Sequence, residues 1–196
     1  MNDLFSSPVL RVDQPRNAPA ARSRYTVKDG RGNLLATAEE RDVSRFRQAV
    51  RTALGGNDGR RVVHVESAQG APLMIVDKVG FTRGARVTTP EGAPIGSMTQ
   101  TSKPYTYTLL DAAERPVGVL EGNLRGRKFA VMDGYGNHLA QVEKEWKGIA
   151  TELLTTADRY SVQIHQPLYD PFRALVPAAP LAIDLMFYET KDWPIG

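Results

Sequence analysis

The sequence of 196 residues contains no cysteine. This absence excludes a disulfide framework, a thiolate metal site and a cysteine nucleophile, and it fits a reducing, cytoplasmic compartment. The sequence also lacks a Gly-x-Ser-x-Gly nucleophile elbow and a nucleotide-binding glycine loop followed by lysine. Because no catalytic signature is left, we expect a protein that is not an enzyme.

Long hydrophobic runs are also scarce. The longest, Ala174 to Tyr188, is interrupted by Pro177, Pro180 and Asp184, whereas a membrane-spanning helix needs about 20 apolar residues. No signal peptide is expected, because the first residues contain no continuous apolar stretch. Basic residues number 25 against 22 acidic ones. A basic contact surface must therefore come from placement rather than from total charge, and no nucleic-acid partner is expected.

The sequence does contain a repeat of turn signals, each placed between two short β-branched or alternating runs. The signals begin at Ser67, Thr89, Asp111 and Asp133, spaced 22 residues apart, with an earlier copy at Asp29. Short strands with regular turn punctuation predict serial hairpins. A sixth hairpin is expected over residues 149–164, turning at 156–159.

About six hairpins give about twelve strands, and an open sheet of that size would leave exposed edges. The predicted fold is therefore mainly β, a closed antiparallel barrel. Its interior is too wide for strand side chains alone. The segment at about 172–188 is apolar nearly all round, which predicts a buried helix inside the barrel. Asp184 within that helix then needs a buried partner.

The remaining segments complete the predicted organisation. Val43, Phe46 and Val50 follow helical spacing, so an extra amphipathic helix is expected near residues 40–54. Residues 1–23, rich in Pro, Ala and Arg, are expected to form a flexible arm. Residues 24–190 then form one barrel domain, and residues 191–196 form a tail.

Charge is predicted to separate between the two ends of the barrel, because serial hairpins place turns at one end and connectors at the other. The turns are mainly acidic and the connectors mainly basic, although charged loops also serve solubility alone. A basic rim attracts anionic headgroups by about 1 kcal/mol for each well-placed residue. The candidate lipid contacts are Arg83, Arg86, Arg125, Arg127 and Lys128, with Arg41 and Arg45 of the predicted helix as a second basic group.

Five ordered segments resemble a known family. They are YTVKDGRG at 25–32, PEGAPIG at 90–96, KEWKG at 144–148, ADRYSVQ at 157–163 and LAIDLMFYE at 181–189. They resemble the phospholipid scramblase and LURP-one-related group, which has the Tubby C-terminal-like fold. That resemblance implies twelve strands around a central apolar helix and a role at lipid membranes.

The chain also departs from this family pattern. It has no cysteine cluster for acylation. In the segment that corresponds to the family's proposed calcium site, only Asp158 matches an acidic position, while Thr156 and Arg159 replace a carboxylate and an amide. We therefore expect no cofactor, and Asp158 is a residual calcium candidate.

These observations predict a non-enzymatic, lipid- or membrane-surface-binding barrel. Its partner would be an anionic lipid or membrane surface, and its location the cytoplasm, with peripheral attachment at the inner face of the membrane. One alternative is a protein-interaction or assembly scaffold that binds another protein through residues 1–23 and 190–196. A second alternative is a phospholipid scramblase.

Overall fold

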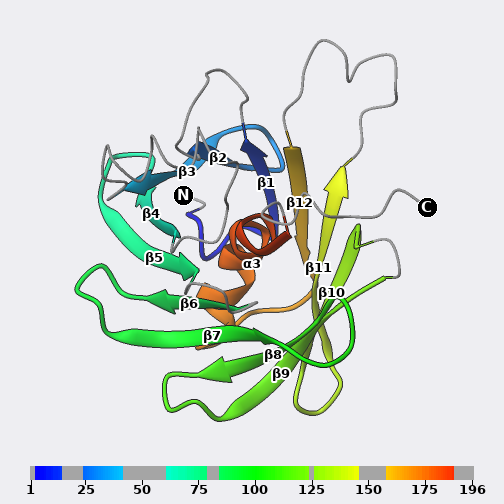
Figure 1. Ribbon diagram of the computed structural model, residues 1–196. Helices are drawn as coiled ribbons and strands as arrows, with labels where there is room; N and C mark the ends of the chain where they lie inside the picture. The colour runs from blue at the N-terminus through cyan, green and yellow to red at the C-terminus, as the bar shows by residue number, and fades with distance from the viewer. Residues whose placement is uncertain are drawn as a thin grey trace, which may run out of the picture.

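The computed structural model describes residues 3–14, 24–41, 61–78, 84–123, 126–145 and 158–187, which form twelve strands and one long helix. The strands are β1 (Val9–Gln14), β2 (Arg24–Asp29), β3 (Leu34–Arg41), β4 (Arg61–Ser67), β5 (Pro72–Lys78), β6 (Gly84–Thr88), β7 (Pro94–Gln100), β8 (Thr106–Asp111), β9 (Pro116–Gly122), β10 (Lys128–Asp133), β11 (His138–Glu145) and β12 (Asp158–Ile164). Each strand pairs with its neighbours along the chain, and β1 pairs with β12 to close the barrel. The helix, α3 (Phe172–Phe187), lies inside it (Figure 1). The predicted fold is confirmed.

Within the described residues, five hairpin turns share one hydrogen-bonding pattern. In the turn that begins at Asp133, the Gly136 amide donates to the Asp133 carbonyl, and the Asp133 amide donates to the Asn137 carbonyl. The same pattern begins at Asp29, Ser67, Thr89 and Asp111, and the strand register shifts beside each of these turns. This is a type I turn followed by a bulge, whose fourth residue needs a positive φ. The 22-residue spacing therefore reflects a repeated turn geometry.

The first strand corrects the predicted N-terminal arm. Residues 9–14, assigned to the arm from its Pro, Ala and Arg content, form β1 between β2 and β12. Their alternation places Leu10 and Val12 in the core with almost no exposed surface. The sequence did not predict this strand because alternation over six residues is a weaker signal than the Pro, Ala and Arg content around it. In addition, β12, one of the two strands that pair with β1, is remote in sequence.

The predicted sixth hairpin is also corrected. Asp158 and Arg159, expected in a turn, lie in β12 opposite Gln14 and Asp13 of β1. β12 therefore pairs with β1, so the first and the last strand of the barrel are hydrogen-bonded to each other. The amphipathic helix predicted near 40–54 is wrong at its start, because Glu40 and Arg41 end β3 and pair with β4. The rest of that predicted helix lies outside the described residues.

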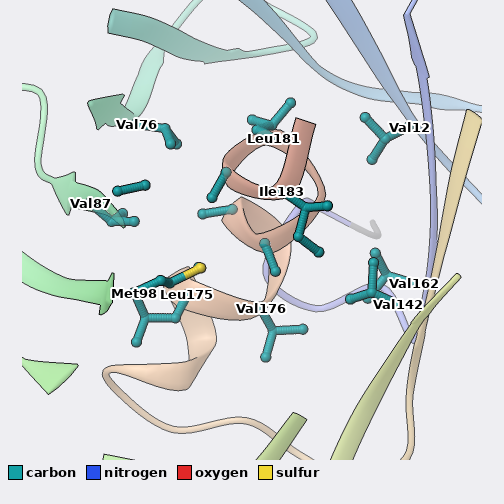
Figure 2. Close-up of a cluster of buried hydrophobic side chains, with 14 of the residues drawn as sticks. Val12, Val76, Val87, Met98, Val142, Val162, Leu175, Val176, Leu181 and Ile183 are labelled. Carbon is teal, nitrogen blue, oxygen red and sulfur yellow. The ribbon is translucent and has the colours of Figure 1, made fainter. Parts of the chain in front are cut away.

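The core forms between α3 and the inward side chains of the strands. Figure 2 shows Leu175, Val176 and Leu181 of the helix facing strand residues that include Val76 and Val162. From Ala174 to Met186 every helix residue is buried. Alanines at 178, 179 and 182 let the strands approach the helix closely. A helix that is apolar on all sides is stable only when it is enclosed in this way.

Asp184 is the only polar residue in the buried part of this helix, Ala174–Met186, and it has the buried partners that the sequence requires. The Tyr25 hydroxyl donates to one carboxylate oxygen at 2.6 Å, and the Tyr160 hydroxyl donates to the other at 3.1 Å. All three residues are almost completely buried. Hydrogen bonds to a buried carboxylate offset much of its desolvation cost. Because Tyr25 and Tyr160 lie on β2 and β12, these bonds also fix the rotation of α3.

The barrel has two ends that differ in construction. The turn end comprises the five hairpin turns (29–33, 67–71, 89–93, 111–115 and 133–137), residues 3–8 and the start of α3. At the connector end, β3, β5, β7, β9 and β11 finish and the next strands begin. Since α3 starts at the turn end, its last residues approach the connector end.

Candidate functional site

The described members of the predicted basic rim lie around the connector end without forming one patch. Arg41 is on β3, Arg86 is on β6, and Lys128 begins β10. The strand order separates these three positions by several strands. Arg45, Arg83 and Arg125 lie outside the described residues, so the complete rim stays a prediction.

Each of these three exposed cations has a carboxylate nearby. Arg41 is 2.6 Å from Glu66 and Lys128 is 3.1 Å from Glu143. Arg86 lies opposite Asp77 in the pairing of β5 with β6. Exposed pairs of this kind contribute about 0–1 kcal/mol and exchange readily with other partners. The wall near the connector end is therefore a mixed surface, with its basic residues partly neutralised.

Two connectors meet at Tyr105 and bring basic residues together. The Gly122 amide donates to the Tyr105 carbonyl at 2.8 Å. A Cβ added at Gly126 would lie 2.8 Å from the Tyr105 ring, so the ring packs directly on this glycine. Lys103 precedes Tyr105, and Arg127 and Lys128 follow Gly126. We call this group of Lys103, Tyr105, Gly126, Arg127 and Lys128 the Tyr105 corner.

Local strain and capping hold the Tyr105 corner in place. Tyr105 has φ of 58°, an uncommon value for a residue other than glycine. The Asn123 side chain accepts hydrogen bonds from the amides of Arg127 at 2.9 Å and Lys128 at 3.4 Å. Burial raises the pKa of the Tyr105 phenol, so this side chain stays neutral. The backbone that carries Lys103, Arg127 and Lys128 is therefore held at a fixed contact between the Tyr105 ring and Gly126. Sequence analysis included Arg127 and Lys128 among the candidate contacts but missed the part played by Tyr105.

A second basic group lies inside the connector end, in strands rather than in exposed connectors. Lys78 is only 6% exposed, and it pairs through the backbone with Arg61. Arg61 is 3.1 Å from the buried Glu40 carboxylate. Lys144 lies 5.6 Å from the centre of the Tyr160 ring. Strand alternation was the available signal, because Lys78 continues the inward series of Met74 and Val76.

The turn end keeps a negative charge. A hydrogen bond from the Asn137 side chain, with others from backbone amides, lowers the pKa of Asp133. The Asn33 side chain does the same to the pKa of Asp29. Hydrogen bonds from the Arg115 amide and guanidinium lower the pKa of Asp111. These three turn carboxylates therefore stay ionised near neutral pH, whereas the separation of charge between the two ends of the barrel stays a prediction.

Neither a metal site nor a membrane-crossing helix is found in the described part of the chain. Its His, Asp and Glu residues form no group of three that could hold a metal ion. The backbone of Asp158 begins β12, and its side chain lies outside the description, so its role in calcium binding stays a prediction. No helix among the described residues is long and apolar enough to cross a bilayer.

Comparison with known proteins identifies the family and the fold. The scramblase family model matches residues 21–190. A crystal structure of an Arabidopsis thaliana protein superposes with a TM-score of 0.54, at 14% sequence identity, and the match covers 91% of each chain. At that identity the structural likeness concerns the fold alone.

Proposed function

We propose that this chain, which belongs to the scramblase family, is a non-enzymatic barrel that binds anionic lipid headgroups through its connector end. The family relates the chain to lipids in general terms. The observation that carries the finer proposal is the Tyr105 corner, where two connectors pack together through Tyr105, Gly122 and Gly126. Lys103, Arg127 and Lys128 lie within two residues of this contact along the chain. Basic residues near a membrane surface each contribute about 1 kcal/mol of attraction.

The enclosed helix supports a peripheral mode of binding. Its leucines Leu175 and Leu185 are at most 1% exposed and belong to the core formed with the strands. Inserting them into a bilayer would require opening the barrel and breaking the Tyr25–Asp184 hydrogen bond. Electrostatic docking through the connector end needs no such rearrangement. The acidic turn end would then face away from the anionic surface.

Vesicle flotation tests this proposal. The protein is mixed with vesicles of phosphatidylcholine alone, or with vesicles that also contain about 30% phosphatidylserine and so have an anionic surface. Each mixture is measured at low and at high salt. Binding is expected only to the anionic vesicles, and it should weaken as salt rises. The double substitution Lys103→Glu with Arg127→Glu should abolish it.

Arg31→Glu is the matched control, since it reverses one exposed charge at the turn end. It should leave flotation unchanged. Glu143→Lys gives a gain-of-function arm, because Glu143 is the ion-pair partner of Lys128. That variant should bind anionic vesicles more tightly. Indifference of binding to salt and to the Lys103/Arg127 reversal would refute docking at this corner. Transbilayer movement of labelled lipid in the same vesicles would favour scrambling over simple binding.

A further inference from the structure

The turn end contains a cavity of about 670 Å³, a volume typical of ligand and peptide sites. It opens between the turns at 89–93 and 111–115 and the start of α3. Its apolar lining includes Phe5, Ile95, Ala113 and Pro171. A second cavity, of about 570 Å³, lies on the other side of Phe5 and Arg173, which line both. The Arg173 guanidinium is 5.6 Å from the centre of the Phe5 ring, so this pair forms the wall between them.

Exposed apolar side chains gather at the same end of the barrel. Among the described residues, the exposed large hydrophobic side chains are Tyr135 at 92%, Tyr169 at 79% and Leu34 at 42%. Tyr135 lies in the turn 133–137, Tyr169 lies just before α3, and Leu34 follows the turn 29–33. Of these three, Tyr169 directly precedes Asp170, which lines the cavity. Exposed tyrosines are typical of protein-contact surfaces.

The charge around the cavity determines what it can accept. Asp111 and Asp133 stay ionised because turn hydrogen bonds lower the pKa of each. Glu91 and Glu114 are exposed at the tips of the two turns beside the cavity. The lining itself carries two carboxylates, Asp111 and Asp170, and two guanidinium groups, Arg115 and Arg173, and Arg115 is bound by Asp111 at 2.8 Å. The lining is therefore close to neutral, and the acidic excess around the cavity comes from Glu91 and Glu114. An anionic lipid would meet repulsion here, whereas a cationic segment would meet complementary charge.

We propose that this cavity is a docking site for a basic segment of a partner protein, with one bulky apolar side chain of that segment seated against Phe5 and Ile95. The flanking lysines or arginines would lie over Glu91 and Glu114. This site is at the opposite end of the barrel from the Tyr105 corner. The protein can therefore hold a membrane with one end and a basic partner with the other. The proposal does not depend on lipid binding.

The probe is an acetylated, amidated peptide, Lys-Lys-Phe-Lys-Lys, titrated into the full chain by calorimetry at low salt. Two matched peptides carry either Gly in place of Phe or Glu in place of every Lys. The first peptide should bind, the Gly peptide should bind about tenfold more weakly, and the Glu peptide should not bind. Equal binding of the Phe and Gly peptides would show that the cavity takes no side chain, and would overturn the proposal.

Substitutions then locate the site. Ala113→Trp fills the cavity from an exposed turn position, and Glu91→Lys with Glu114→Lys reverses the charge of its rim. Each change should weaken binding of the Phe peptide about tenfold or more. Glu121→Lys, an exposed charge reversal of the same sign near the far end of β9, is the control and should have no effect. Circular dichroism melting checks that each variant is folded. Unchanged affinity in both folded variants would contradict the proposal.

Two other occupants of the cavity, a second copy of this chain or a membrane, would give different results. Sedimentation that reveals concentration-dependent self-association, lost in the Glu91/Glu114 variant, would identify a second copy of this chain as the occupant and overturn a basic partner. Loss of flotation on anionic vesicles in the cavity-filling Ala113→Trp variant would identify a membrane instead, and would also overturn it. Retained flotation together with lost peptide binding is the result that supports the proposal.

Discussion

The turn end and the connector end of this barrel are ordered by different kinds of interaction. At the turn end, the hydrogen bonds that shape a hairpin join residues within one short segment: the Asp133 carboxylate accepts from the amides of Tyr135 and Asn137. At the connector end, the buried polar contacts join distant parts of the chain. Tyr25 donates to Asp184, and Arg61 donates to Glu40. One end therefore depends on local chemistry, and the other depends on barrel closure.

This difference predicts how the two ends respond to substitution. A local turn that loses one hydrogen bond is exposed, so water can replace the missing partner. A buried group near the connector end that loses its partner stays desolvated and raises the free energy of the folded state. Changes inside the connector end should therefore cost much more stability than changes at the turns.

The largest effect is expected from Glu40→Ala. Glu40 is 1% exposed and holds Arg61 through its carboxylate. Removing it leaves the half-buried Arg61 without this partner, and breaking a buried pair costs about 3–5 kcal/mol. Urea unfolding measures the change. The comparison is Glu39→Ala, one residue earlier, which removes an exposed pair with Arg24 and should cost less than about 1 kcal/mol. Similar losses of stability in the two variants would contradict the expectation that buried contacts at the connector end stabilise the protein more than exposed ones.

An intermediate effect is expected from Tyr25→Phe. The substitution removes the hydroxyl that donates to Asp184 at 2.6 Å and leaves the ring in place. The loss of a hydrogen bond to a buried carboxylate should destabilise the protein by about 1.5–3 kcal/mol. Tyr135→Phe is the control, since Tyr135 is 92% exposed and its hydroxyl faces solvent. An unchanged urea midpoint for Tyr25→Phe would mean that Asp184 does not depend on this bond for stability.

The same contrast explains what the sequence could predict. The turns at Ser67, Thr89, Asp111 and Asp133 were recognisable because all their determinants lie within five residues. The buried helix was recognisable because its sequence is apolar on every face. β1 was missed because its partners are β2 and the remote β12. The Tyr105 corner was missed because it forms only when two connectors, about twenty residues apart in sequence, pack together.

A smaller effect at the turn end should appear as a dependence on pH. The folded-state pKa values of Asp111 and Asp133 lie below the ordinary aspartate value of 3.8, because hydrogen bonds within each turn stabilise the carboxylate. Their stabilisation is complete above the unfolded pKa and is lost as pH falls through the folded pKa. Urea midpoints between about pH 5 and 2 measure the loss. The Asp111→Asn, Asp133→Asn variant should lose less stability over that window than the unmodified chain. Identical acid sensitivity would mean that other groups dominate.

The smallest effect is expected from Glu114→Gly. The fourth residue of each turn has positive φ, and Gly92 occupies that position at 90° whereas Glu114 occupies it at 60°. A non-glycine residue in the left-handed region costs about 1–2 kcal/mol, and part of the gain from glycine is offset by the greater freedom of the unfolded chain. Glu114→Gly should therefore raise stability by about 0.5–1 kcal/mol. Gly92→Ala at the equivalent position should lower it by a similar amount, although a Cβ there would contact nothing within 4 Å. Because that space is open, a loss of stability in Gly92→Ala would be caused by the backbone conformation and not by a steric clash. Urea unfolding of both variants measures the changes. If both variants became more stable, or both less stable, the two turns would not share one geometry in solution.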